Sequence, residues 1–116
     1  VHAHTHLRTL KGVKSTLENL KEALGGETYE FQSMYPPMIA DAKAEGNEAA
    51  VRTFTYANEV EKVHAALYQK AIDNLSKPQA DVDYYVCSVC GYTCEMEAPE
   101  ECPVCKAKKK AFNKIS

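Results

Sequence analysis

The chain has 116 residues, which is enough for about one domain of ordinary size. A hydrophobic content of 45%, a charged content of 26% and a net charge of −2 are typical of a globular chain, and they exclude the strongly basic surface expected of a protein that binds nucleic acid or an anionic membrane. No apolar run approaches the ~18 residues of a membrane-spanning helix, and no charged-then-apolar leader indicates secretion.

The first ten residues read as the end of a helix. Val1-His2-Ala3 recurs later in the chain as Val63-His64-Ala65, so His2 is a candidate counterpart of His64 on an equivalent helix that would begin upstream of residue 1. A fraying, histidine-rich terminus or the remnant of a tag is the alternative interpretation. We expect the helical interpretation, in which His2 is a candidate metal ligand.

A long helical pattern follows. Ser15 and Glu18 form a capping box, which predicts the start of a helix at this point. The pattern continues to about Glu45, but Gly25-Gly26 and Pro36-Pro37 interrupt it. At the prolines we expect a kink or a local break in the helix.

Gly46-Asn47 predicts the end of this helix and the cap of a second one, which runs from about Glu48 to Leu75. Ser76-Lys77-Pro78-Gln79 is the predicted linker to the remaining residues. Strand-like alternation is absent before Asp81.

Two pairs of polar residues have the spacing of one helix face: Glu27 with Glu30, and Glu61 with His64. Each pair alone is ordinary on a solvated helix. Counted outward from the Gly46-Asn47 turn, however, the two pairs differ in height by only about 3 Å in an antiparallel hairpin. We therefore expect three carboxylates and an imidazole around one point, which is half of the ligand set of a di-iron site in a four-helix bundle.

All five cysteines lie near the carboxyl end. Four of them form Cys87-x-x-Cys90 and Cys102-x-x-Cys105, and we expect Cys94 to be a spare thiol. Two such pairs a short loop apart predict one ion held by four thiolates rather than a disulfide framework. Sulfur ligands in a tetrahedron suit iron or zinc, and this spacing alone leaves both metals open.

The segments around these residues, and their order, are similar to the rubrerythrin family. The similarity rests on Ser15-Thr16-Leu17-Glu18-Asn19-Leu20, Gly26-Glu27-Thr28-Tyr29-Glu30, Met34-Tyr35-Pro36, Glu45-Gly46, Glu61-Lys62-Val63-His64 and the cysteine segment. It implies an all-α, ferritin-like part of a four-helix bundle over residues 1–77, incomplete and starting inside the family's second helix. A small rubredoxin-like metal knuckle with four cysteine ligands would follow over residues 78–116.

The resemblance also implies roles for single residues. Glu27 matches a terminal carboxylate ligand of the di-iron site, Glu61 matches a bridging one, and His64 matches the imidazole on the same iron as Glu27. Glu30 and His2 match a pair that exchanges at the other iron when it is oxidised.

Tyr35 matches a tyrosine that hydrogen-bonds a carboxylate of the site. The activity implied is a non-haem iron peroxidase of the cytoplasm, which reduces hydrogen peroxide to water in defence against oxidative stress. Iron in the tetrathiolate site, where zinc can substitute, would pass single electrons to the di-iron site. The implied partners are rubredoxin or an NAD(P)H-linked reductase as electron donor, and a second copy of the chain in a head-to-tail homodimer.

Two other functions fit parts of the sequence: a helical binding module that carries a zinc ribbon, and ferritin-like iron storage with ferroxidase activity. The absent helices leave two hypotheses as well. Either a longer chain supplies them, or two hairpins pair about a twofold axis and each contributes Glu27, Glu61 and His64.

Overall fold

The computed structural model describes residues 1–78 and 80–115. Gln79 of the predicted linker and Ser116 of the predicted second domain lie outside the described residues. The helical elements are α1 (His2–Thr9), α2 (Thr16–Tyr29), the π-helical segment η1 (Glu30–Met34), α3 (Tyr35–Ala44) and α4 (Glu48–Asn74). They are followed by β1 (Tyr84–Cys87), β2 (Thr93–Glu95), the short 3₁₀ turn η2 (Lys109–Ala111) and β3 (Phe112–Ile115).

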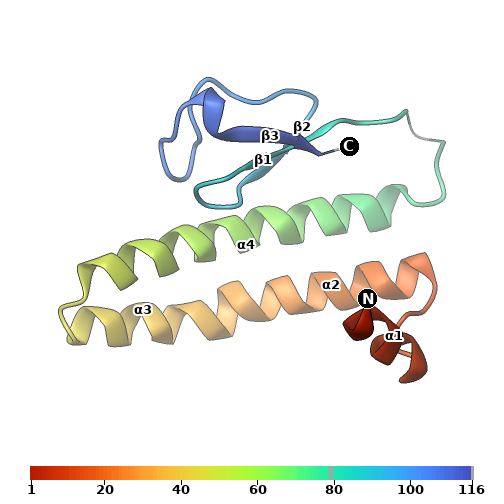
Figure 1. The fold of residues 1–116 in the computed structure, drawn as a ribbon, viewed down its shortest axis with the longest axis horizontal. Coiled ribbons are helices and arrows are strands. Elements are labelled where there is room, and N and C mark those ends of the chain that lie inside the picture. The colour runs from red at the N-terminus through yellow and green to blue at the C-terminus, as the bar shows by residue number, and fades with distance from the viewer. Residues whose placement is uncertain (79, 116) are drawn as a thin grey trace.

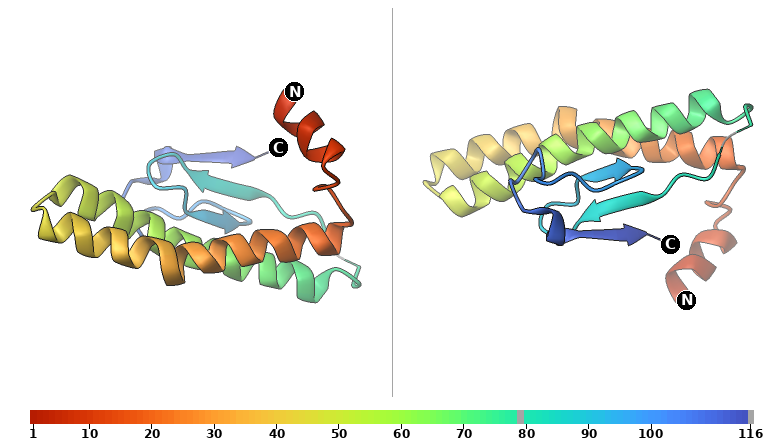
Figure 2. Two further views of the ribbon diagram at one scale, coloured as in Figure 1. Left: turned by 90° about the horizontal axis from the view of Figure 1, so that it is seen from below. Right: turned by 90° about the horizontal axis from the view of Figure 1, so that it is seen from above.

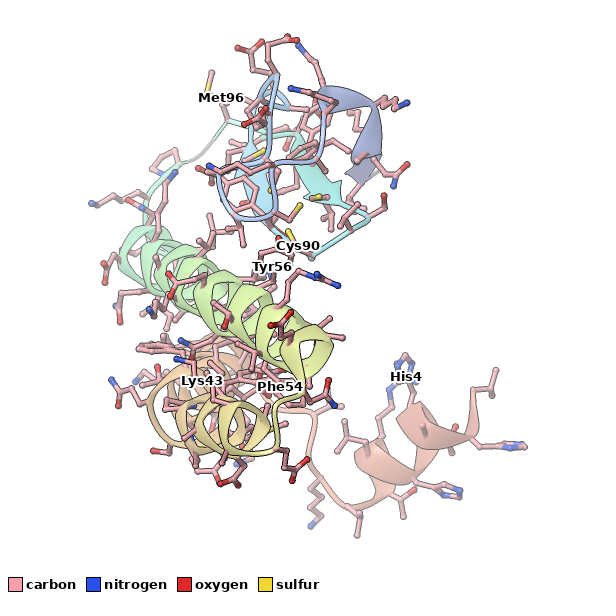
Figure 3. The ribbon with its side chains drawn as sticks, turned by 90° about the vertical axis from the view of Figure 1, so that its left-hand side faces the viewer. His4, Lys43, Phe54, Tyr56, Cys90 and Met96 are labelled. Carbon is pink, nitrogen blue, oxygen red and sulfur yellow. The ribbon has the colours of Figure 1, made fainter. Side chains whose placement is uncertain are left out.

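The elements are arranged in three layers. The line of α2, η1 and α3 lies on one side of α4, and the small sheet lies on its other side (Figures 1 and 3). The first helix, α1, which carries His4, stands apart from the hairpin (Figures 2 and 3). Among the described residues, no helix combines the length and the apolar character needed to cross a membrane.

The predicted capping box begins α2. The Glu18 N–H donates to Ser15 Oγ at 3.3 Å, and the Ser15 N–H donates to Glu18 Oε2 at 3.1 Å. The interruption expected at Gly25-Gly26 is wrong, because α2 continues through both glycines. Two glycines lower helix propensity by only about 1 kcal/mol each, and packing of α2 along α4 outweighs this loss.

The local break expected at the prolines is confirmed, and it has a defined form. Pro36 and Pro37 lie in the first turn of α3, where they have no N–H to donate to the preceding turn. The Tyr35 N–H donates instead to the carbonyl of Glu30, five residues back. The chain therefore widens into the π-helical segment η1 directly before α3.

The predicted hairpin turn and second helix are confirmed. Gly46 adopts a φ of +68°, a left-handed conformation that favours glycine, and Asn47 Oδ1 accepts the Ala50 N–H at 3.1 Å. Val60, at the middle of α4, is 2% exposed. Burial of one such side chain contributes about 1.5–3 kcal/mol, so the centre of α4 is where the layers are held together.

The strands form one antiparallel sheet in the order β2-β1-β3. The strands described all lie after Asp81, as expected. The interior of this small module contains little hydrocarbon: its buried residues are Cys87, Ala98 and Cys102, and the rings of Tyr92 and Phe112 pack edge to face at 6.2 Å. So small a core is typical of a module that a metal stabilises.

Polar contacts join the small module to α4. Lys70 of α4 forms an ion pair with Glu95 of β2. His64 of α4 bonds through Nε2 to the carbonyl oxygen of Gly91 at 3.1 Å. The module is thus docked on the helix that carries half of the predicted carboxylate site.

Candidate metal centres

The hairpin brings three of the predicted ligands together. Glu27 of α2 and Glu61 and His64 of α4 each offer one ligand atom, and these atoms all lie within 4.8 Å of one another. His64 Nδ1 is 3.0 Å from Glu61 Oε2 and 3.6 Å from Glu27 Oε2. The side chains are largely buried, with 25% of His64, 19% of Glu27 and 14% of Glu61 exposed.

The electrostatics of this cluster suit a cation. Burial, a hydrogen bond with Glu61 and the charge of Glu61 raise the pKa of Glu27 to about 7, against the opposing effect of His64. Glu27 Oε2 is buried and has no hydrogen-bond partner among the described residues. A divalent ion between the carboxylates would neutralise their charge and give this oxygen a partner, so the donor set fits a metal. Mixed carboxylate and imidazole donors are suitable for iron.

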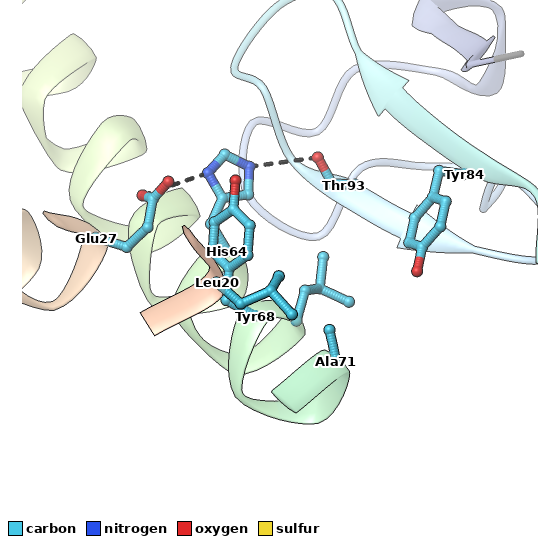
Figure 4. A pocket seen from close by; sticks show the side chains of 8 residues that line it. Leu20, Glu27, His64, Tyr68, Ala71, Tyr84 and Thr93 are labelled. Carbon is cyan, nitrogen blue, oxygen red and sulfur yellow. Dashed lines mark hydrogen bonds and ion pairs between the residues drawn. The ribbon is translucent and has the colours of Figure 1, made fainter. Parts of the chain in front are cut away.

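His64 faces the cluster with a defined nitrogen. The carbonyl oxygen of Gly91 can only accept a hydrogen bond, so Nε2 is the donor in the 3.1 Å contact between them. Nδ1 is then the ring nitrogen that points to Glu27 and Glu61, as Figure 4 shows for Glu27. A metal-ligating histidine commonly has this arrangement, with its second ring N–H held by a backbone carbonyl.

Two predicted ligands lie outside this three-residue group. Glu30 is not part of the group whose ligand atoms lie within 4.8 Å of one another, and its role as a ligand stays a prediction. Glu30 begins the π-helical segment η1. His2 lies exposed on α1, where its ring is 6.4 Å from that of His6.

Tyr35 lies at the start of α3, close to the cluster. Burial raises the pKa of its hydroxyl, and the charges of Glu61, Glu30 and Glu27 raise it further. The phenol therefore stays protonated at neutral pH. No hydrogen bond from this hydroxyl to a carboxylate is formed within the described part of the chain, and the ring packs against Phe54 with centroids 6.4 Å apart.

The second centre is the group of four cysteines. Cys87 Sγ and Cys105 Sγ are 3.7 Å apart, and Cys90 Sγ and Cys102 Sγ are 3.6 Å apart. A regular tetrahedron of sulfurs about 2.3 Å from a metal has edges of about 3.8 Å. The thiols are free of disulfides, so they fit one tetrahedrally bound ion.

Backbone amides help these sulfurs to carry charge. Burial would raise the pKa of Cys87, but hydrogen bonds from the Val89 and Cys90 amides, together with contacts to neighbouring thiols, lower it. Burial raises the pKa of Cys105, and the Ala107 amide opposes that effect. Such amide hydrogen bonds stabilise a thiolate and adjust the reduction potential of a bound iron.

Cys94 lies on β2, outside the four-cysteine group. Its thiol bonds weakly to backbone carbonyl oxygens, at 3.8 Å from Tyr85 and 3.5 Å from Glu97. Burial raises its pKa, so it remains a protonated thiol rather than a reactive thiolate.

Sequence reasoning missed Thr93. Its Oγ1 lies 3.3 Å from His64 Nε2, and both residues line a cavity of about 490 Å³ that extends from Glu27 to Tyr84 (Figure 4). No local pattern could have indicated this contact, because it depends on how the module is placed against α4.

A helical hairpin with a carboxylate and histidine cluster, docked against a four-cysteine knuckle, defines a ferritin-like protein with a rubredoxin-like module. The family described as Rubrerythrin matches residues 2–72, and the family described as Rubrerythrin, rubredoxin-like domain matches residues 85–113. The chain therefore belongs to the rubrerythrin family, which confirms the resemblance seen in the sequence.

Comparison with individual proteins supports this family assignment. Rubrerythrin-2 of Clostridium acetobutylicum is 36% identical over 129 residues, covering 97% of this chain and 70% of the relative. Nigerythrin of Nitratidesulfovibrio vulgaris is 40% identical over 94 residues, covering 81% of this chain and 46% of the relative. A solved structure of nigerythrin in its fully reduced, all-ferrous state superimposes with a TM-score of 0.82 and 38% identity, covering 89% of this chain and 50% of that one. The chain thus spans about half the length of nigerythrin.

Proposed function

We propose that this chain carries the iron-binding hairpin and the electron-carrying module of a peroxidase that reduces hydrogen peroxide to water. Glu27, Glu61 and His64 would hold iron of a di-iron site, and the four cysteines would hold one further iron. Glu30, His2 and the residues of a further chain segment or of a second hairpin are the candidates for the remaining ligands.

One observation carries this proposal: a single side chain contacts both the carboxylate cluster and the loop that holds two of the cysteines. His64 Nδ1 is 3.0 Å from Glu61, and His64 Nε2 is 3.1 Å from the carbonyl oxygen of Gly91, the residue after Cys90. A peroxidase that receives single electrons needs a short bonded path between its sulfur centre and its carboxylate site. A storage protein or a purely structural zinc ribbon does not need such a path.

The overall reaction balances with an external reductant: one hydrogen peroxide, two electrons and two protons give two molecules of water. Bound iron would supply the electrons, one from each Fe(II) that becomes Fe(III). Rubredoxin or an NAD(P)H-linked reductase would return them singly through the cysteine module.

The protein's own residues hold and orient the components. Glu27 and Glu61 approach from opposite helices, and His64 is fixed between them and the module. Tyr35 keeps its phenolic proton at neutral pH, because burial and the surrounding carboxylates raise its pKa, so it can donate a hydrogen bond to an anionic oxygen at the site. A head-to-tail homodimer in the cytoplasm is part of the same proposal.

Stopped-flow spectroscopy tests this function. The protein is loaded with iron, reduced anaerobically and mixed with hydrogen peroxide, while the visible absorbance of the ferric cysteine centre is followed. We expect rapid return of this absorbance, with two electrons consumed per peroxide. Glu61→Gln should lose the rapid phase, and Glu59→Gln should keep it, because Glu59 is exposed and pairs only with Lys62.

Other results would contradict the proposal in recognisable ways. Oxidation by dioxygen with accumulation of a ferric core, and no response to peroxide, would indicate ferroxidase activity. A protein that takes up only zinc at the cysteines and no metal at the hairpin would be a binding module.

A further inference from the structure

A large cavity opens beside the carboxylate cluster, and reduction of hydrogen peroxide would use only one end of it. The cavity has a volume of about 490 Å³ and lies between α2, α4 and the cysteine module (Figure 4). Glu27 and His64 both form part of its wall. A water molecule occupies about 30 Å³ in the liquid, so hydrogen peroxide, which has one oxygen more, fills a small part of this space. The remaining volume is available to a larger substrate.

The register of the hairpin decides where the cavity begins and ends. Leu20 lies two helical turns before Glu27 on α2, and Ala71 lies two helical turns after His64 on α4. Because α2 and α4 run antiparallel (Figure 1), both residues lie about 10 Å from the cluster, at the same end of the cavity. The cavity is therefore elongated, with a polar end at the cluster and an apolar end two turns away.

Hydrocarbon forms most of the wall between these ends. Leu67 and Tyr68 line the cavity from α4, and Tyr84 lines it from β1. The Tyr84 hydroxyl donates to Glu95 Oε1 at 3.4 Å, so the polar end of this side chain already has a partner. Among the described residues of the wall, the only carboxylate and the only imidazole belong to the cluster. Since an apolar protein cavity of about 150 Å³ is enough to bind benzene, this wall suits a hydrocarbon group.

We propose that the cavity binds the hydrocarbon tail of an organic hydroperoxide, ROOH, and places its O–O group at the carboxylate cluster. The inference rests on the proposed function for the reductive step and adds a class of substrate. The reaction balances with the same external reductant: ROOH, two electrons and two protons give ROH and water. The O–O bond breaks, one oxygen leaves as the alcohol and the other as water, and the two electrons come from two Fe(II) that become Fe(III).

The kinetic test compares two hydroperoxides. The reduced, iron-loaded protein is mixed with hydrogen peroxide or with cumene hydroperoxide, and stopped-flow absorbance gives a second-order rate constant for each. We expect rapid reduction of both. Ala71→Phe fills the apolar end, and it should lower the ratio of the cumene hydroperoxide rate constant to the hydrogen peroxide rate constant at least tenfold, because one methylene in an apolar pocket already changes specificity about 10–200-fold. Ala49→Phe is the matched control, since Ala49 is exposed on the same helix and lies outside the cavity wall.

Binding is measured separately with cumyl alcohol, the product of that reduction. The full chain with zinc as its bound metal is titrated with the alcohol while the ¹H–¹³C methyl signals of Leu67 are followed. We expect saturable shifts in the wild type and in Ala49→Phe, and binding at least about tenfold weaker in Ala71→Phe. Leu20→Phe narrows the cavity from the facing helix and should act like Ala71→Phe, and circular dichroism verifies that each variant keeps its helices.

The outcomes separate this inference from the proposed function. Reduction of hydrogen peroxide without reduction of cumene hydroperoxide or binding of cumyl alcohol would overturn the inference and leave the proposed function intact. Equal effects of Ala71→Phe and Ala49→Phe would overturn it as well. Failure to reduce either hydroperoxide, together with alcohol binding that depends on Ala71, would refute the proposed function and the reductive step while confirming the cavity as a binding site for a hydrocarbon group.

Discussion

The two metal centres of this chain are built in opposite ways. The cysteine centre comes from two tight turns within residues 87–105, and backbone amides of the same turns bond its sulfurs. The hairpin centre joins side chains of α2 and α4, and its His64 also donates a hydrogen bond to the module. The cysteine site is formed by one short segment and needs only that segment to fold. The hairpin site forms only when the two helices pack in the correct register.

The centres also differ in how their polar atoms are satisfied. The four sulfurs lie close together at a spacing that suits a tetrahedron, and backbone amides lower the pKa of Cys87 and oppose the effect of burial on the pKa of Cys105. The hairpin site instead contains Glu27 Oε2, which is buried without a hydrogen-bond partner among the described residues. We therefore expect the cysteine centre to be sensitive to loss of a single ligand and the hairpin centre to be sensitive to pH and to metal.

The largest effect is expected from Cys102→Ser. Cys102 is fully buried, and a structural metal contributes on the order of 10 kcal/mol to the folding of a small module. Metal analysis should show the cysteine-bound ion lost, and circular dichroism should show the sheet lost and the helices kept. Cys94→Ser is the control and should retain the metal. Full metal content in Cys102→Ser would contradict the assignment of the four ligands.

The second effect is the pH dependence of the unfolding free energy of the metal-free protein. The pKa of Glu27 is raised from 4.5 to about 7, so between these values the folded chain holds a proton that the unfolded chain releases. Unfolding free energy should therefore be greatest below about pH 4.5 and fall by about 3 kcal/mol as the pH rises past about 7. Urea denaturation of the wild type and of Glu27→Gln checks this, because the variant should lack the slope.

The third effect is on metal affinity. Glu27→Gln removes a charged ligand oxygen but keeps the size of the side chain, so we expect the helical site to bind Fe(II) at least 10–100-fold more weakly, with the cysteine centre unchanged. Anaerobic titration measures this affinity. Glu22→Gln, an exposed change on the same helix, should leave it unaltered. Equal binding by wild type and Glu27→Gln would show that the hairpin cluster is not a metal site.

The smallest effect concerns docking of the module. Lys70 is 57% exposed in its ion pair with Glu95, and such pairs contribute about 0–1 kcal/mol. Lys70→Met should therefore change the unfolding free energy by less than about 1 kcal/mol, and less at high salt than at low salt. A loss as large as that of Cys102→Ser would mean that this pair, rather than His64 and its contacts, holds the layers together.

Much of the fold could be predicted because the signals were local. The capping box at Ser15, the Gly46-Asn47 turn and the long helix after it each depend on neighbouring residues. The interruption expected at Gly25-Gly26 was wrong for the opposite reason, since tertiary packing against α4 overrides a weak local preference.

The candidate site was predictable where hairpin register alone decides the geometry. Glu27 meets Glu61 and His64 because these residues lie at nearly equal numbers of residues before and after the turn. Glu30 is outside their group, and the roles of Glu30 and His2 as ligands stay predictions. Thr93 could not have been found, since its contact with His64 arises from the packing of one part of the chain on another.

The π-helical segment between α2 and α3 has a consequence for tolerance to length changes. Removing one residue from Glu30–Met34 would let the backbone resume a regular helix, because the Tyr35 N–H could still bond the Glu30 carbonyl, now four positions back instead of five. Tyr35 would then keep its place beside Phe54, whereas the same deletion inside α2 would rotate everything that follows by about 100° about the helix axis. A single-codon deletion should therefore be tolerated at the wide turn and disruptive one turn earlier.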